Sequence, residues 1–157
     1  MTSEADPTAS GDPLSPRELA AWRGMLRVHA RVTQVLDAEM RDAHGLTVSQ
    51  YEVLLFLGDA PDHRVRMADL AARVLLTRSG VTRLVDRLVD LGFVERCAAE
   101  GDGRGAYAQL TKGGAEVLRA ARRTHLRGVR EQFLGRLDDD EQEALGDAWL
   151  RVLGERG

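Results

Sequence analysis

The feature that most constrains the fold is a helix followed directly by a two-stranded hairpin, within residues 78–111. In a helix with about 100° per residue, four apolar side chains fall on one face. They are Val81, Leu84, Val85 and Leu88. The opposite face carries Ser79, Thr82, Arg83 and Asp86, with Arg78 and Arg87 at its margins. Hydroxyl and guanidinium groups are side chains that read base edges in a major groove. The pattern predicts a helix that is buried on one side and reads DNA on the other.

The hairpin has a glycine-rich tip at residues 101–105, where Arg104 stands alone among glycines. Asp102, two positions earlier, can hold the guanidinium in place. A narrow, electronegative minor groove attracts an arginine presented in this way. A groove-reading helix beside a basic fingertip is the arrangement of a winged helix-turn-helix, so we expect double-stranded DNA as a partner.

The net charge of −3 is no objection to DNA binding, because the charge is unevenly distributed. Residues 64–130 carry 14 basic and 7 acidic groups, a local charge of +7. Residues 131–157 carry 3 basic and 8 acidic groups, a local charge of −5. Attraction to a phosphate backbone depends on the local field. The positive field covers the predicted reading helix and the helix that follows the wing.

Capping signals delimit the remaining helices. The expected N-terminal caps are Ser15 with Glu18, Thr47 with Gln50, Thr77, Thr111, and the segment Leu137–Glu141. The first helix should run to about Ala43, with His44-Gly45 as its stop. A short strand is expected at His63–Arg66, followed by a short amphipathic helix at Met67–Val74. With the reading helix, this last element completes a helix-turn-helix.

These elements predict a mostly α-helical fold with a small β-wing. We expect a disordered tail at residues 1–13, a helical dimerisation region at 14–45 and 112–157, and a winged helix-turn-helix at 46–111. The first helix is too long and too broadly apolar to cover one small domain. The late helices have little to pack on except that helix and a second copy of the chain. A homodimer on a pseudo-palindromic site is therefore expected.

The sequence resembles the MarR family of winged-helix regulators over roughly Ser15 to Arg156. The resemblance is strongest in residues 67–71 (MADLA), 79–88 (SGVTRLVDRL) and 102–104 (DGR), followed by 110–114 (LTKGG). It implies a dimer clamped by the first and last helices, a recognition helix in the major groove and a wing arginine in the minor groove. It also implies release from DNA when a small molecule, often a phenolic or lipophilic anion, binds. We therefore expect a transcriptional regulator of this kind, most often a repressor.

The residues assigned to DNA contact lie on the reading helix and the wing. They are Thr77, Arg78, Ser79, Thr82, Arg83, Arg87 and Arg104, with Asp102 as support for the wing. Arg83 is the best candidate for bidentate guanine readout, whereas Arg78 and Arg87 are expected on phosphates. Asp86 would repel phosphates and is expected to orient Arg83 or Arg87 instead.

The residues assigned to an effector pocket are Trp22, His29 and Tyr51. Trp22 and His29 lie on the apolar stripe of the first helix, where packing in a dimer core is the alternative. His29 could pair with an aromatic or lipophilic anion near neutral pH.

Other functions find less support in the sequence. The histidines are widely separated and form no metal-ligand spacing, and the single cysteine, Cys97, is expected to be a small half-buried residue. A metal- or redox-responsive regulator and a winged-helix protein–protein adaptor remain the alternatives.

No phosphate loop or nucleophile motif suggests an enzyme, and no cofactor is expected. Without a signal peptide or membrane span, the expected location is the cytoplasm, in association with the nucleoid.

Overall fold

The computed structural model describes residues 11–74, 78–98 and 106–155. Their contacts divide the chain into two compact units, residues 1–31 and 32–157. Most of the predicted disordered tail lies outside the described residues, and residues 11–13 hold neither helix nor strand.

The long first helix, α1, spans Pro16–His44 and so belongs to both units. Its start has the predicted capping geometry, because the Ser15 amide donates to Glu18 Oε2 at 2.8 Å and the Glu18 amide donates to Ser15 Oγ at 3.3 Å. Gly45 follows its last turn with φ of +67°, a conformation that favours glycine. The predicted boundaries of this helix are confirmed.

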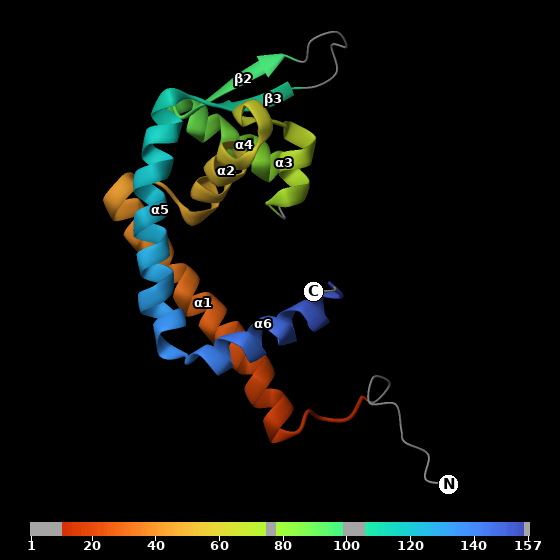
Figure 1. Cartoon of the computed structure of the whole chain (residues 1–157). Helices are drawn as coiled ribbons and strands as arrows, with labels where there is room; N and C mark the ends of the chain where they lie inside the picture. The colour runs from red at the N-terminus through yellow and green to blue at the C-terminus, as the bar shows by residue number, and fades with distance from the viewer. Residues whose placement is uncertain (1–10, 75–77, 99–105, 156–157) are drawn as a thin grey trace. The chain divides into compact units, whose positions relative to one another are not determined.

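The second unit contains the remaining elements (Figure 1). They are α2 (Val48–Asp59), η1 (Pro61–His63), β1 (Arg64–Arg66), α3 (Met67–Arg73), α4 (Arg78–Asp90), β2 (Val94–Ala98), β3 (Ala106–Leu110), α5 (Lys112–Gln132), η2 (Leu134–Arg136) and α6 (Asp139–Leu153). This order confirms a mostly helical fold with a small sheet. The predicted N-caps Thr47 and Thr111 accept backbone hydrogen bonds at the starts of their helices. The last helix opens within the predicted segment Leu137–Glu141, and its N-cap is Asp138.

The three strands form one antiparallel sheet in the order β1-β3-β2. Val94 pairs with Leu110 and Val65 with Ala108, so one face of the sheet is apolar and buried. Helices α2 and α4 contact the strands, and α3 packs on α4 (Figure 1). Residues from α2, α3, α4, the strands and α5 share one core. The helix-turn-helix and the wing are therefore parts of one packed body.

Candidate nucleic-acid interface

Helix α4 is held by a continuous apolar face. Val85 and Leu88 are fully buried and Val81 is 1% exposed, in the same core as Leu70 of α3. Burying a side chain of this size contributes about 1.5–3 kcal/mol. Three such anchors at helical spacing fix which way the rest of the helix points, and they confirm the predicted inner face.

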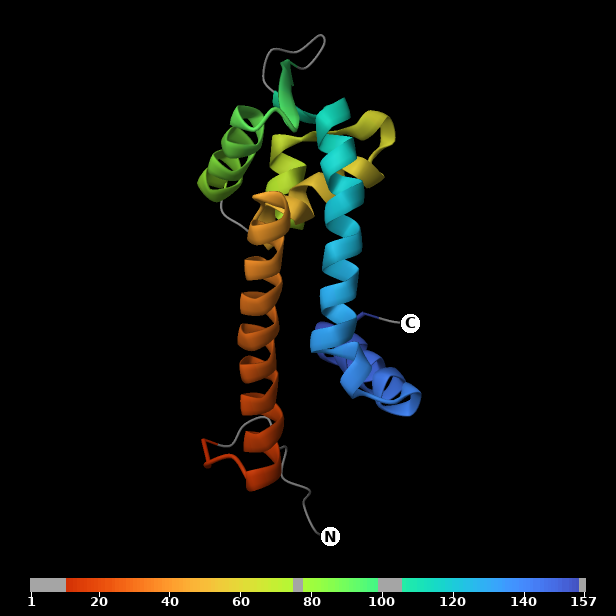
Figure 2. The same cartoon turned by 90° about the vertical axis from the view of Figure 1, so that its left-hand side faces the viewer.

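The outward face of α4 brings together the side chains predicted to read DNA. Ser79, Thr82, Arg83 and Arg87 are all exposed. In Figure 2 this helix, coloured green, lies at the margin of the helices that surround the core. Two hydroxyls and two guanidiniums on one exposed helix face can donate hydrogen bonds to base edges and phosphates.

Part of the predicted interface cannot be placed. Thr77, Asp102 and Arg104 lie outside the described residues, and the side chain of Arg78 is not described, although its backbone begins α4. The DNA contacts assigned to these four residues stay predictions.

Asp86 has a different partner from the one predicted. Its Oδ1 lies 2.7 Å from Nη2 of Arg96 in β2, rather than orienting Arg83 or Arg87. The chain reverses after α4 at Gly92, whose φ is +75°, and β2 then returns beside the helix. Both side chains are partly exposed, so the pair contributes at most about 1 kcal/mol. It still compensates one of the two exposed carboxylates of α4, which reduces repulsion of phosphates.

The root of the wing is fixed to the end of α4 by Thr111. Its amide donates to Phe93 O at 3.1 Å and its hydroxyl donates to Gly92 O at 2.7 Å. The same hydroxyl accepts from the Gly114 amide at 3.0 Å, which caps α5. A Cβ at Gly114 would collide with the carbonyl oxygen of Phe93, so this close approach requires glycine. The cap was predicted, but its bond to Gly92 was not.

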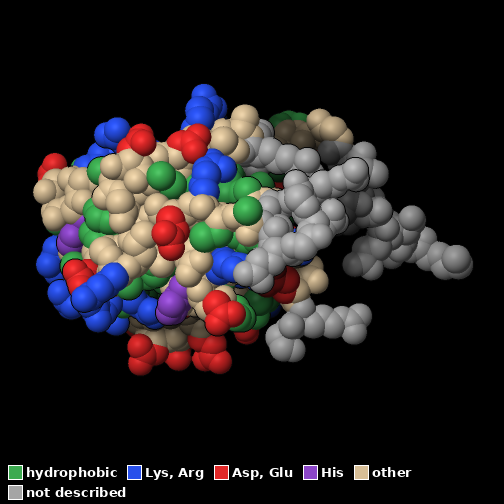
Figure 3. Space-filling model, turned by 90° about the horizontal axis from the view of Figure 1, so that it is seen from above, with side chains coloured by type: hydrophobic (Ala, Val, Ile, Leu, Met, Phe, Trp, Pro, Cys, Tyr) green, Lys and Arg blue, Asp and Glu red, His purple; other side chains and the backbone are tan. Residues whose placement is uncertain are grey.

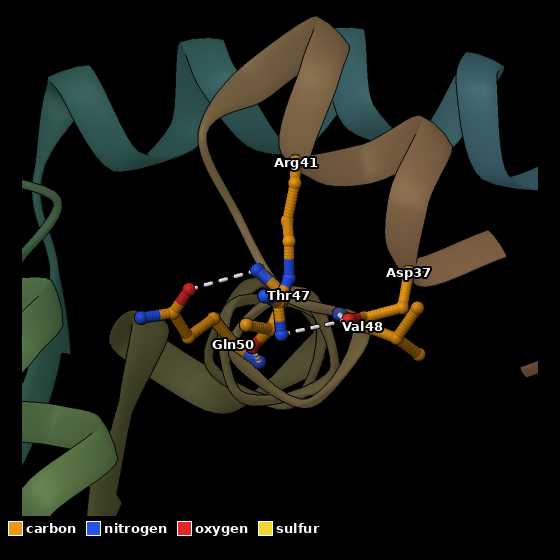
Figure 4. A network of polar contacts seen from close by, with 5 residues as sticks. All are labelled: Asp37, Arg41, Thr47, Val48 and Gln50. Carbon is orange, nitrogen blue, oxygen red and sulfur yellow. Dashed lines mark hydrogen bonds and ion pairs between the residues drawn. The ribbon is translucent and has the colours of Figure 1, made fainter. Parts of the chain in front are cut away.

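A second joint ties the end of α1 to the start of α2 (Figure 4). The Val48 amide donates to Asp37 Oδ1 at 2.9 Å, while Asp37 Oδ2 pairs with Arg41 at 2.8 Å. Thr47 and Gln50 form the predicted reciprocal capping box, at 3.1 and 2.8 Å. Asp37 lies eleven residues before the amide that it accepts from, so no local capping motif predicts its role.

The predicted effector residues fall in both units. Trp22 and His29 belong to residues 1–31, where Trp22 is 53% exposed, whereas Tyr51 is buried in the second unit. The Tyr51 ring lies 4.7 Å from the ring of His125, centroid to centroid. Burial raises the pKa of the Tyr51 hydroxyl and lowers the pKa of the His125 imidazole. The grouping of Trp22, His29 and Tyr51 into one site stays a prediction.

His125 was not predicted as an effector residue. Its Nδ1 is buried and has no hydrogen-bond partner among the described residues. His125 lies on the same side of α5 as the buried residues Ala121, Thr124 and Gly128. The helical spacing of these small residues is the sequence signal that could have placed His125 on the inward side. Thr124 itself lies 2.8 Å from His44 Nε2, through its hydroxyl.

The described residues contain no group of three His, Cys, Asp or Glu side chains that could hold a metal ion. Cys97 is half-buried as expected, and its Sγ donates to Gln109 Oε1 at 3.4 Å across the sheet. Over the described ranges, every helix is too short or too polar to cross a bilayer.

Comparison with known proteins points to one family. The family model described as MarR family matches residues 44–105. The chain is 32% identical to the HTH-type transcriptional repressor YetL of Bacillus subtilis over 69% of this chain and 66% of that one. Two solved structures of MarR family transcriptional regulators from Streptomyces coelicolor are also similar.

The first of these structures is AbsC, with a TM-score of 0.84 and 31% identity over 91% of this chain and 95% of AbsC. The second is Sco3205 in complex with DNA, with a TM-score of 0.85 and 31% identity over 91% and 89%. The matches cover both the winged-helix region and the long helices around it. The chain therefore belongs to the MarR family of transcriptional regulators.

Proposed function

We propose that the chain is a sequence-specific DNA-binding regulator that acts as a homodimer on a pseudo-palindromic operator. The observation that carries the proposal is α4, which buries Val81, Val85 and Leu88 and exposes Ser79, Thr82 and Arg83. A rigidly seated helix with an exposed polar face of this composition suits a major groove.

The side chains of α4 have separate roles in this proposal. The planar guanidinium of Arg83 donates two hydrogen bonds to O6 and N7 of a guanine. The hydroxyls of Ser79 and Thr82 can donate or accept a hydrogen bond, so they discriminate less between bases. Arg78 and Arg87 contact phosphates on either side of the groove, and Thr77 adds a phosphate contact at the helix start. On the wing, Arg104 enters the minor groove with Asp102 as its support.

The relatives support both DNA binding and repression. Sco3205 is similar over nine-tenths of this chain, and its structure was solved in complex with DNA. YetL is described as a transcriptional repressor. We infer repression as the mode of action for this chain: a dimer bound to its operator blocks transcription.

The C-terminal helix supports the homodimer. Helix α6 contains no buried residue, and it leaves Val152 76% and Leu153 67% exposed. Trp149 on the same helix is 37% exposed. Large apolar side chains gathered on a helix mark an interaction surface. A second copy of the chain would cover them.

Release by a small molecule is the last part of the proposal. The buried Nδ1 of His125 has no partner among the described residues, and leaving such an atom unsatisfied costs free energy. The ring of Tyr51 lies beside it. An aromatic or lipophilic anion could stack on the tyrosine and accept a hydrogen bond from the imidazole. The dimer is proposed to have a second conformation, in which the spacing of its two reading helices does not match the half-sites. An effector that binds this conformation preferentially would increase its population and so release the dimer from DNA.

The experiment that tests the proposal is retention of sheared genomic DNA by the purified protein at about 150 mM salt, followed by sequencing of the retained fragments. We expect enrichment of a pseudo-palindrome whose half-sites lie about one helical turn apart. Uniform retention, or none above low salt, would contradict sequence-specific binding and favour an adaptor that uses the winged-helix fold for protein contact.

A further inference from the structure

The outer face of the small sheet carries a cluster of two arginines and one tyrosine. Alternation along β1 buries Val65 and turns Arg64 and Arg66 to the other side of the sheet. The register pairs Arg66 with Tyr107 of β3, and Arg64 with the residue two positions further on. All three side chains therefore lie on the face of the sheet that is turned away from the core.

Tyr107 holds both guanidinium groups. The Cζ of Arg64 lies 4.3 Å from the centroid of the Tyr107 ring, and that of Arg66 lies 5.4 Å away. Arg66 Nε also donates to the tyrosine hydroxyl at 2.9 Å. Cation–π contact and this hydrogen bond restrict two long side chains that would otherwise be mobile. The cluster is therefore a preorganised pair of positive charges.

No carboxylate neutralises this pair among the described residues. Glu95 is the acidic residue on the same face, but it lies on β2 and is separated from Arg64 by the intervening strand β3. Asp69, in the first turn of α3, is also near in sequence. Neither forms an ion pair with Arg64 or Arg66 in the described part of the chain. Two cations fixed on one phenol ring repel each other, and an anion between them would relieve that repulsion.

The position of the cluster indicates which anion it meets. Arg66 is the N-cap residue of α3, the first helix of the helix-turn-helix. Tyr107 is the second residue of β3, which begins directly after the residues predicted to form the tip of the wing. The cluster thus lies at the wing end of the sheet. Figure 3 views the end of the molecule that holds the sheet and shows Lys and Arg side chains exposed there. A duplex read by α4 and the wing would pass close to this edge.

We propose that Arg64, Arg66 and Tyr107 form a phosphate-binding site for the DNA backbone beside the half-site that α4 reads. The proposal rests on the proposed function and extends it to flanking DNA outside the operator. Arginine contacts to phosphate carry no sequence information. The site therefore adds affinity for a longer duplex whatever its flanking sequence.

The test compares two duplexes made from the enriched operator: the operator alone, and the operator with about ten base pairs of unrelated sequence on each side. Binding is measured by fluorescence anisotropy over a range of salt concentrations. Each phosphate contact contributes about 0.9 to the slope of log K against log salt, which is roughly fivefold in affinity at 0.15 M. We expect the wild type to bind the longer duplex more tightly, with a slope that is steeper by about 2.

The variants separate the arginines from the tyrosine. In the Arg64→Gln/Arg66→Gln protein the advantage of the longer duplex should disappear, while affinity for the operator alone is kept. Tyr107→Phe keeps the ring beside Arg64 and removes only the hydroxyl that accepts from Arg66, so it should lose part of the advantage. Arg130→Gln, an exposed arginine near the far end of α5, is the matched control and should behave as the wild type. Thermal unfolding checks that each variant is folded.

Three results would overturn the proposal, each in a different way. If wild type and the double variant gain equally from the flanks, or if neither gains, the cluster binds no phosphate and the proposed function still stands. If the wild type retains no specific duplex at all, the proposed function fails and the flanking site fails with it. Loss of operator binding by a folded Tyr107→Phe protein would also contradict a contact restricted to the flanks.

Discussion

Helices α4 and α6 are short amphipathic helices of one compact unit, 13 and 15 residues long, and they treat their apolar faces differently. Helix α4 buries Val81, Val85 and Leu88 almost completely within its own chain. Helix α6 buries no residue and leaves Val152 and Leu153 mostly exposed. The apolar face is thus buried within the chain in α4 and left exposed in α6. A single chain buries the apolar anchors of α4, whereas it leaves the large apolar side chains of α6 exposed, where a partner could cover them.

The largest expected effect comes from removing an anchor of α4. Leu88→Ala deletes a fully buried side chain, so the free energy of unfolding should fall by about 2–5 kcal/mol. Urea denaturation followed by circular dichroism measures the change. Leu91→Ala, at a leucine that is 37% exposed, is the control and should cost clearly less. Equal losses at the two positions would show that α4 is not seated as described.

The next effect concerns α6. Val152→Glu should hardly change the stability of an isolated chain because the side chain is 76% exposed. In a homodimer that covers this position, a buried carboxylate without a partner would raise the dissociation constant of the dimer about 100-fold, which corresponds to about 3 kcal/mol. Sedimentation equilibrium measures this constant. Arg151→Glu places a carboxylate on the neighbouring, polar side of the helix and should leave the dimer intact. A Val152→Glu protein that dimerises normally would mean that α6 is not the dimer surface.

A smaller effect is expected on the outward face of α4. Arg83→Ala removes an exposed side chain, so stability should be unchanged, while binding to the operator should weaken by about 1–3 kcal/mol and selectivity at one base pair should relax. A panel of single-base operator variants in a gel-shift assay measures both. Arg130→Ala makes the same charge change on α5 and serves as the control. Uniform weakening on every sequence would instead assign Arg83 to phosphate.

The smallest effect concerns α5, which connects the wing to α6 and carries His125. Burial lowers the pKa of this imidazole in the folded chain. Below about pH 6.5, His125 is therefore protonated to a greater extent in the unfolded chain than in the folded chain. The free energy of unfolding should therefore fall as the pH is lowered from 6.5 toward 5. His125→Gln should flatten that part of the curve and leave the curve above pH 7.5 parallel to that of the wild type. Parallel curves throughout would show that His125 does not contribute.

Local structure was predictable because its signals are local. The capping boxes at Ser15 and Thr47 and the stop at Gly45 are read from residues that lie close together in the sequence. The two faces of α4 follow from helical period alone, and the structure confirms them. These signals do not depend on how the elements pack.

Contacts between elements were not predictable in the same way. Asp86 meets Arg96 because the turn at Gly92 brings β2 back along α4. Asp37 accepts from Val48, and Tyr107 lies against Arg64 and Arg66, only after distant segments have paired. A register shift of one residue would turn these strand residues to the other face. Such partners therefore require the tertiary structure.

The measurement that tests the central claim most directly is the number of chains bound to one operator duplex, determined by sedimentation velocity on the enriched site. One chain carries one reading helix, and the exposed apolar side chains of its α6 are proposed to be covered by a second copy. The account therefore predicts two chains on a duplex whose half-sites are about one turn apart. Lengthening the spacer by about five base pairs turns one half-site to the opposite side of the duplex and should abolish tight binding. A single bound chain, with an affinity that ignores the spacer, would contradict the account.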